Sequence, residues 1–204
     1  MIKKFDGYDD IEIFEGGKAL EVGGYILKIM NAKVEEYATC SILKVAIDIA
    51  EGEFKDHFKE RFERDKKSNS DAKWKGIFDV FIPKDDGSEL DNYTKQNFKR
   101  FITSVEKSNK GFKWAWDETK LKGKLFGGIF GREEFQTDKG EYKFAVKCRW
   151  CNSVETIKSG DFKIPDDKLI KRDNASVEIN ASAGIGVGNL EDFEEILADG
   201  EIPF

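Results

Sequence analysis

Histidine and cysteine are scarce in this chain of 204 residues, and long apolar runs are absent. The pair Cys148 and Cys151 has the spacing of half a zinc site, but there is no second pair and the only histidine is His57, so we interpret both cysteines as structural. No run approaches the ~20 apolar residues that span a membrane. The start, Met1–Gly7, has no signal-peptide core. We therefore expect a reduced, intracellular protein without a cofactor.

Nucleotide-binding and catalytic motifs are also missing. The glycines at 184, 186 and 188 lack the strand–turn–helix context of a dinucleotide site, and residues 127–131 lack the lysine of a phosphate-binding loop. The acids Asp48, Glu51 and Glu53 lie near the end of an expected strand, which leaves a metal-dependent nuclease open. Chance clusters are common in a chain with 40 acids, so we expect no enzyme.

Charge is present in abundance but unevenly distributed. The net charge of −6 argues weakly against binding to nucleic acid. Without the six acids of residues 189–204, however, the remaining 34 acids balance the 34 lysines and arginines. Residues 95–150 hold fourteen basic and seven acidic side chains. This contrast between a basic central block and an acidic end favours a nucleic-acid-binding body with an interacting tail.

The acidic end has a distinctive order of residues. Residues 180–188 are small and glycine-rich, which predicts a flexible arm. The arm carries acids and ends with an apolar tip, a combination suited to capture by a basic surface with an apolar pocket. A frayed terminus or a last helix is the alternative, because four apolar residues have helical spacing: Leu190, Phe193, Ile196 and Leu197.

The last six residues, 199–204, resemble the C-terminal tip of bacterial single-stranded-DNA-binding proteins, in which an acidic arm ends in Ile-Pro-Phe. The match covers little more than these residues, and the body departs from ordinary members of that family by its helical insertions. The resemblance implies that the tip recruits other proteins through Asp199, Glu201, Ile202, Pro203 and Phe204.

Periodicity predicts a mainly β body with two helices. Strands are expected at 22–34, 39–49, 74–82, 121–135 and 142–150, with a weak last strand at 154–158. Phenylalanines at every fourth position predict a helix within 51–67, and Phe98, Phe101, Ile102 and Val105 form the apolar stripe of another at 91–108. Short strands with inserted helices fit an antiparallel Greek-key barrel of the OB type.

The hairpin expected at 121–150 mixes cations with aromatic rings. Strand alternation places Phe126 and Phe130 on the same exposed face as Lys122 and Lys124, provided that no bulge resets the parity. Lysine and arginine neutralise phosphates, and aromatic rings stack on bases. The predicted nucleic-acid-binding residues are Trp74, Lys75, Trp114, Trp116, Lys122, Lys124, Phe126, Phe130, Arg132, Lys143, Lys147 and Arg149. An ordinary solvated sheet face is the alternative.

Residues of about 20–165 also look like a family of uncharacterised bacteriophage proteins. The resembling stretches are 49–54, 74–76, 108–111, 121–124 and 127–128. This resemblance implies a role near phage replication or recombination but assigns no residue roles.

We therefore predict an N-terminal segment at 1–19, an OB-like domain at 20–170 and a disordered acidic tail at 171–204. The expected function is binding of single-stranded DNA with little sequence preference in the cytoplasm of a bacterial host, with no membrane partner. A protein-interaction adaptor without DNA affinity and homo-oligomer formation both stay open.

Overall fold

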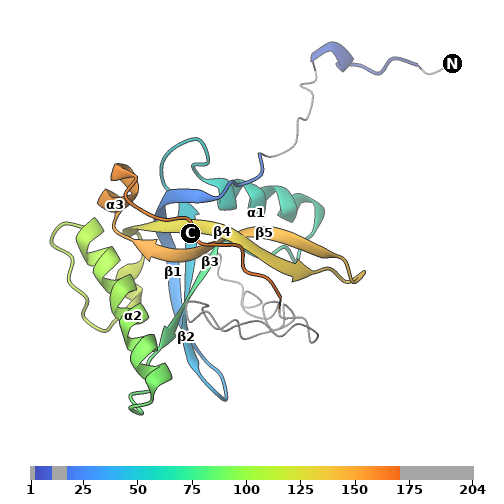
Figure 1. Ribbon diagram of the computed structural model, residues 1–204. Coiled ribbons are helices and arrows are strands. Elements are labelled where there is room, and N and C mark those ends of the chain that lie inside the picture. The colour runs from blue at the N-terminus through green and yellow to red at the C-terminus, as the bar shows by residue number, and fades with distance from the viewer. Residues whose placement is uncertain (1–2, 11–17, 171–204) are drawn as a thin grey trace.

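The computed structural model describes residues 3–10 and 18–170. Within them, five antiparallel strands form one open sheet in the order β3-β2-β1-β4-β5. The strands are β1 (Gly23–Glu36), β2 (Ser41–Ile49), β3 (Ile77–Ile82), β4 (Leu125–Gln136) and β5 (Tyr142–Asn152). The helices are α1 (His57–Ser68), α2 (Glu89–Ser108) and α3 (Val154–Ser159), with short 3₁₀ turns η1 (Tyr8–Asp10) and η2 (Glu118–Leu121). In Figure 1, β1 and β2 cross β4 and β5 steeply, and α2 covers one end.

The mainly β prediction is confirmed, but one element was predicted wrongly. Residues 154–158, expected as a strand, lie in α3. The Ser153 hydroxyl accepts a hydrogen bond from the Thr156 amide and so begins a helix, which ends at Gly160 with a φ of +73°. The helix expected within 51–67 begins only at His57. No helix in residues 3–10 and 18–170 has the length and apolar character needed to cross a bilayer.

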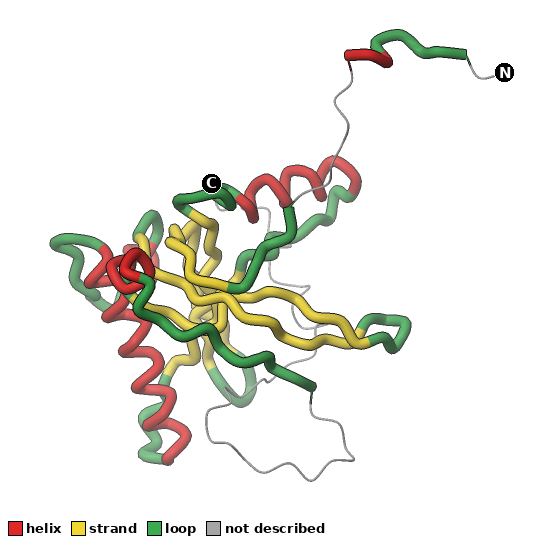
Figure 2. Tube along the Cα trace, turned by 45° about the horizontal axis from the view of Figure 1, so that its top comes forward, coloured by secondary structure: helices red, strands yellow, loops and turns green. Residues whose placement is uncertain are grey.

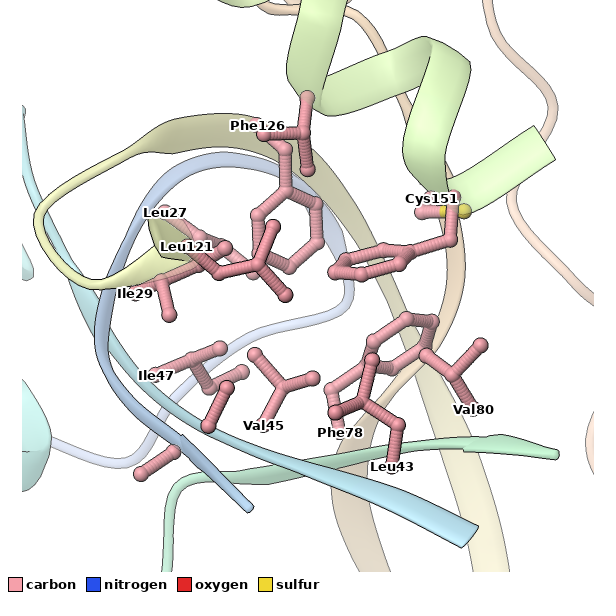
Figure 3. Close-up of a cluster of buried hydrophobic side chains, with 14 of the residues drawn as sticks. Leu27, Ile29, Leu43, Val45, Ile47, Phe78, Val80, Leu121, Phe126 and Cys151 are labelled. Atoms are coloured by element: carbon pink, nitrogen blue, oxygen red, sulfur yellow. The ribbon is translucent and has the colours of Figure 1, made fainter. Parts of the chain in front are cut away.

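The core lies between the crossing strands and under the helices. Leu27 and Ile29 of β1 meet Val45 and Ile47 of β2, and Leu121 points into the same cluster from η2 (Figure 3). The predicted apolar stripe of α2 is confirmed, since all four of its side chains are buried against the sheet: Phe98, Phe101, Ile102 and Val105.

Two glycines of β4 allow other parts of the chain to lie close to both faces of the strand. A Cβ at Gly127 would collide with Ile157 of α3, and a Cβ at Gly128 would collide with Leu27 of β1. A side chain at Gly127 would push α3 away from β4, and one at Gly128 would displace the side chains of Leu27 and Cys148. The glycines therefore allow close packing on both faces of β4, as expected where a strand is closely approached.

The hairpin of β4 and β5 continues past the point where β4 stops pairing with β1. Its far end extends beyond the rest of the sheet (Figure 2). Past Phe130, where the pairing of β4 with β1 ends, the chain returns to lie beside β4. The Lys168 amide donates to the Arg132 carbonyl at 3.0 Å, and the Glu134 amide donates to the Lys168 carbonyl at 2.7 Å. Residues 166–170 thus support the outer half of β4.

Replacing Gly128 by Ala should destabilise the fold, because the added methyl group overpacks the interior against Leu27 and Cys148. We expect a loss of about 1–3 kcal/mol in the free energy of unfolding, measured by urea denaturation. An unchanged unfolding midpoint would contradict the close packing of Leu27 and Cys148 against Gly128.

Candidate nucleic-acid interface

Three of the predicted stacking residues are core residues. Trp74, Phe126 and Phe130 are 3 %, 0 % and 0 % exposed. The Trp74 indole donates hydrogen bonds to the carbonyls of Ile47 and Gly76, at 3.2 and 3.1 Å, so its polar edge is satisfied inside the protein. The prediction that these rings lie on an exposed binding face is therefore wrong: they are not accessible for stacking on bases.

The error has two local causes. Lys122 and Lys124 precede β4 and lie beside a turn at Gly123, whose φ is +79°, so they do not share the strand's alternation. In addition, β4 is buried on both faces: Phe126 and Phe130 share one face, as the alternation predicts, but that face lies in the core, and Ile129 on the opposite face is only 3 % exposed. The extra residue in β5, where Ile129 pairs with Trp150 but Phe130 pairs with Cys148, shifts the pairing without changing the direction of Phe130.

The cations of the hairpin are largely neutralised by their neighbours. Arg132 pairs with Asp167 at 2.7 Å, Lys143 with Glu141 at 3.0 Å, and Lys147 with Glu133 at 3.8 Å. Arg149 donates to the carbonyls of Arg132 and Asp166, both at 3.3 Å. A phosphate would have to compete with these partners, which weakens the case for a basic groove on the hairpin.

Glu133 joins the hairpin to the segment that follows α3. Its carboxylate accepts a hydrogen bond from Lys168 at 2.9 Å. Burial raises the pKa of Glu133, but the Lys168 hydrogen bond and the charges of Lys147, Lys168 and Arg149 outweigh burial and hold the pKa below its ordinary value. The ionised carboxylate thus helps to fasten residues 166–170 to β4.

The most exposed aromatic ring of the described residues is Trp116, with 81 % of its surface open to solvent. Its ring lies nearly parallel to that of Phe98 on α2, with 6.2 Å between centroids and 10° between planes. Trp114 packs beside both rings. The φ of Trp116 is +59°, a conformation that side chains rarely adopt. We call Phe98, Trp114 and Trp116 the aromatic platform.

The loop that carries the two tryptophans is basic. Residues 109–124 include five lysines and two acids. Lys122 is exposed, and the Lys124 ammonium lies over the Phe112 ring at 4.9 Å from its centroid. Four of the predicted residues, Trp114, Trp116, Lys122 and Lys124, thus share one loop. Lys75 is exposed but lies beside the buried Trp74, outside this loop.

Sequence analysis missed a set of cations on α2. Lys99, Arg100 and Lys107 are exposed on the side of the helix opposite to its buried stripe. Together with Lys95 they recur at helical spacing, and this periodicity was the available signal.

The acids considered for a nuclease do not converge. Asp48 accepts backbone hydrogen bonds from Ile49, Phe58 and Lys59, so it holds the start of α1. Glu51 and Glu53 pair with Lys158 and Lys18 respectively. Among the described residues no cluster of three or more histidines, cysteines or acids could hold a metal ion.

The two cysteines of the C-x-x-C pair are packed within the protein. Burial raises the pKa of Cys151 to about 11 and that of Cys148 well above its ordinary value. Both thiols therefore stay protonated at neutral pH, which makes them poor metal ligands and poor nucleophiles.

No protein-family model matches this chain, and a search of the curated proteins finds no match. The predicted partner-binding residues Asp199, Glu201, Ile202, Pro203 and Phe204 lie outside the described residues.

The low pKa of Glu133 predicts a pH-dependent contribution to stability. A carboxyl group whose pKa is lowered by folding stabilises the protein above its ordinary pKa, and this contribution is lost as the pH falls through the folded value. Glu133→Gln should therefore lower the free energy of unfolding at about pH 7, and the difference from wild type should shrink toward about pH 3. Urea denaturation across this range checks it, with the exposed hairpin variant Glu141→Gln as the charge-matched control. If the stability difference between Glu133→Gln and wild type does not change with pH, the lowered pKa of Glu133 is contradicted.

Proposed function

We propose that this protein binds single-stranded DNA with little sequence preference and takes part in DNA replication or recombination. Because its body resembles a family of bacteriophage proteins, we place this activity in the cytoplasm of a bacterial host. The observation that carries this proposal is the exposed Trp116 ring, held parallel to Phe98 in a lysine-rich loop. A ring fixed in this way offers a flat surface for a base, and the surrounding lysines attract phosphates. No base-specific arrangement is needed for either contact.

The strand order supports an OB-like interpretation of the fold. β1 pairs with both β2 and β4, so the order β4-β1-β2-β3 matches the order of strands in a Greek key, which supports this interpretation. The edge strands β3 and β5 contact each other without forming a ladder between them. This contact supports a sheet that curls toward a partly open barrel, an architecture that commonly binds oligonucleotides.

The acidic tip supplies the second half of the proposal. Its resemblance to the tip of bacterial single-stranded-DNA-binding proteins supports recruitment of replication or recombination proteins through Ile202, Pro203 and Phe204. The nearby acids Asp199 and Glu201 would orient the tip toward a basic pocket. An adaptor without DNA affinity uses the same tip, so the DNA measurement below separates the two functions.

Titration of the full-length protein with oligo-dT, followed by tryptophan fluorescence, tests DNA binding. We expect quenching by single strands and much weaker binding of duplex. Trp116→Ala should remove most of the quenching and weaken binding by about 1–3 kcal/mol, since a stacking surface for a base is lost. Trp150→Phe, which alters a half-buried ring on β5, is the matched control and should leave affinity unchanged.

Absence of binding at low salt would sink the DNA proposal and leave the adaptor. Binding that is equally strong in wild type and Trp116→Ala would instead remove the aromatic platform from the interface.

Recruitment is tested by the affinity of the full chain for a bacterial protein that binds the acidic tip of the single-stranded-DNA-binding family. Phe204→Ala should weaken this affinity by about 1.5–3 kcal/mol, because the ring no longer fills an apolar pocket. Fluorescence anisotropy measures the change, and Leu190→Ala serves as the control within the same tail. Equal affinities for Phe204→Ala and wild type would contradict recruitment through the tip.

A further inference from the structure

A shallow hollow of about 510 Å³ lies between α2 and the junction of β5 with α3. Four cations line it, Lys95, Lys99, Arg100 and Lys107, together with serine, threonine and amide side chains. Among the residues that the structure describes, no carboxylate lines this hollow. In a chain with 40 acids, a lining of cations and neutral polar groups indicates a site for an anion.

Three of these cations, Lys99, Arg100 and Lys107, form no ion pair with another described residue, whereas Lys95 pairs with Asp91 at 2.9 Å and also with Asp85. A hydrogen bond from the Trp114 amide lowers the pKa of Glu106, and the charge of Lys99 is near enough to help lower it. Because Arg132, Lys143 and Lys147 of the hairpin are paired with carboxylates, the three α2 cations are better placed to receive a phosphate. We call Lys99, Arg100 and Lys107 the α2 basic face.

Beside the hollow, a hydrogen bond joins α2 to the start of α3, and two more lie within α2. The Ser108 hydroxyl donates to the Ser104 carbonyl at 2.6 Å and accepts from the Val154 amide at 3.0 Å. The Ser104 hydroxyl donates to the Arg100 carbonyl at 2.7 Å. These bonds hold the helix against the β5–α3 junction, so the long cationic side chains project from a backbone that is already in place.

The α2 basic face is on the same helix as the aromatic platform, but it is turned away from that platform. At 3.6 residues per turn, Lys99 points about 100° round the helix from Phe98, and Arg100 and Lys107 point to the far side. From Lys99 to Lys107 the helix rises about 12 Å, which gives room for more than one phosphate. A strand whose base stacks on Trp116 therefore reaches the α2 basic face by passing around the helix over Lys99.

We propose that the α2 basic face binds the sugar–phosphate backbone of the same single strand that stacks on Trp116. This inference rests on the proposed function and extends it, since it assigns the phosphate contacts to α2 instead of the hairpin. Stacking on Trp116 depends weakly on salt, whereas phosphate contacts release counterions and depend strongly on it. The two contributions can therefore be measured separately.

The test combines Lys99→Ala, Arg100→Ala and Lys107→Ala in the full-length protein. Each lost phosphate contact should reduce the slope of log Kobs against log salt by about 0.7, so the triple variant should lose about 2 from the wild-type slope. Binding at low salt should weaken, while the quenching at saturation, which reports Trp116, should stay unchanged. The single variants Lys99→Ala and Lys107→Ala should each lose about 0.7, which tests the proposal even if the triple variant folds poorly.

The matched control removes three exposed lysines elsewhere: Lys55, Lys67 and Lys139. It has the same change in net charge and should keep the wild-type slope. Wild-type binding with an unchanged slope in the triple and single variants overturns this inference alone. Absence of wild-type binding overturns the proposed function as well. If the substitutions abolish binding of poly-glutamate but leave DNA binding intact, the hollow is a site for an acidic peptide and the inference is wrong.

Discussion

The close approach of other elements to the centre of β4 is the constraint on which much of the structure depends. The lack of a side chain at Gly127 lets α3 pack against one face of β4, and the lack of one at Gly128 lets the Leu27 side chain pack against the other. Because α3 is held there, the Ser108–Val154 hydrogen bond can tie α2 to the sheet. The position of α2 in turn sets the position of Phe98 and hence of Trp116. The close packing at Gly127 and Gly128 thus helps to set the position of the exposed Trp116 ring.

Most of the fold could be predicted from the sequence because its strongest signals are periodic. The phenylalanines of α1 and the apolar stripe of α2 recur at helical spacing, and they are buried as this spacing requires. The strand predicted at residues 154–158 was wrong because α3 has only six residues, too few for periodicity to distinguish a strand from a short helix. There the Ser153 cap decided the outcome, and capping is a property of one residue and not of a pattern.

The candidate site was less predictable, for two reasons. Residues 126–131 of β4 are all buried, so the alternation of side chains along this strand does not show which face is open to solvent. The second reason is that cations form ion pairs with acids that are distant in sequence: Arg132 pairs with Asp167, which lies 35 residues away. A local excess of basic residues therefore does not show which cations are available, because neutralising partners arrive from distant parts of the chain.

The helix α2 illustrates how one periodic element can serve both stability and recognition. Its turns place Phe101 and Val105 in the core, while Arg100 and Lys107 point away from it. Phe98 lies between the core and the surface: its side chain is buried with the core residues, and its ring also stacks with the exposed Trp116. In the proposed arrangement the strand meets an aromatic ring supported by the core and cations anchored on the same rigid helix. Binding then orders little of the protein, since the surface is already formed by the packing that stabilises the fold.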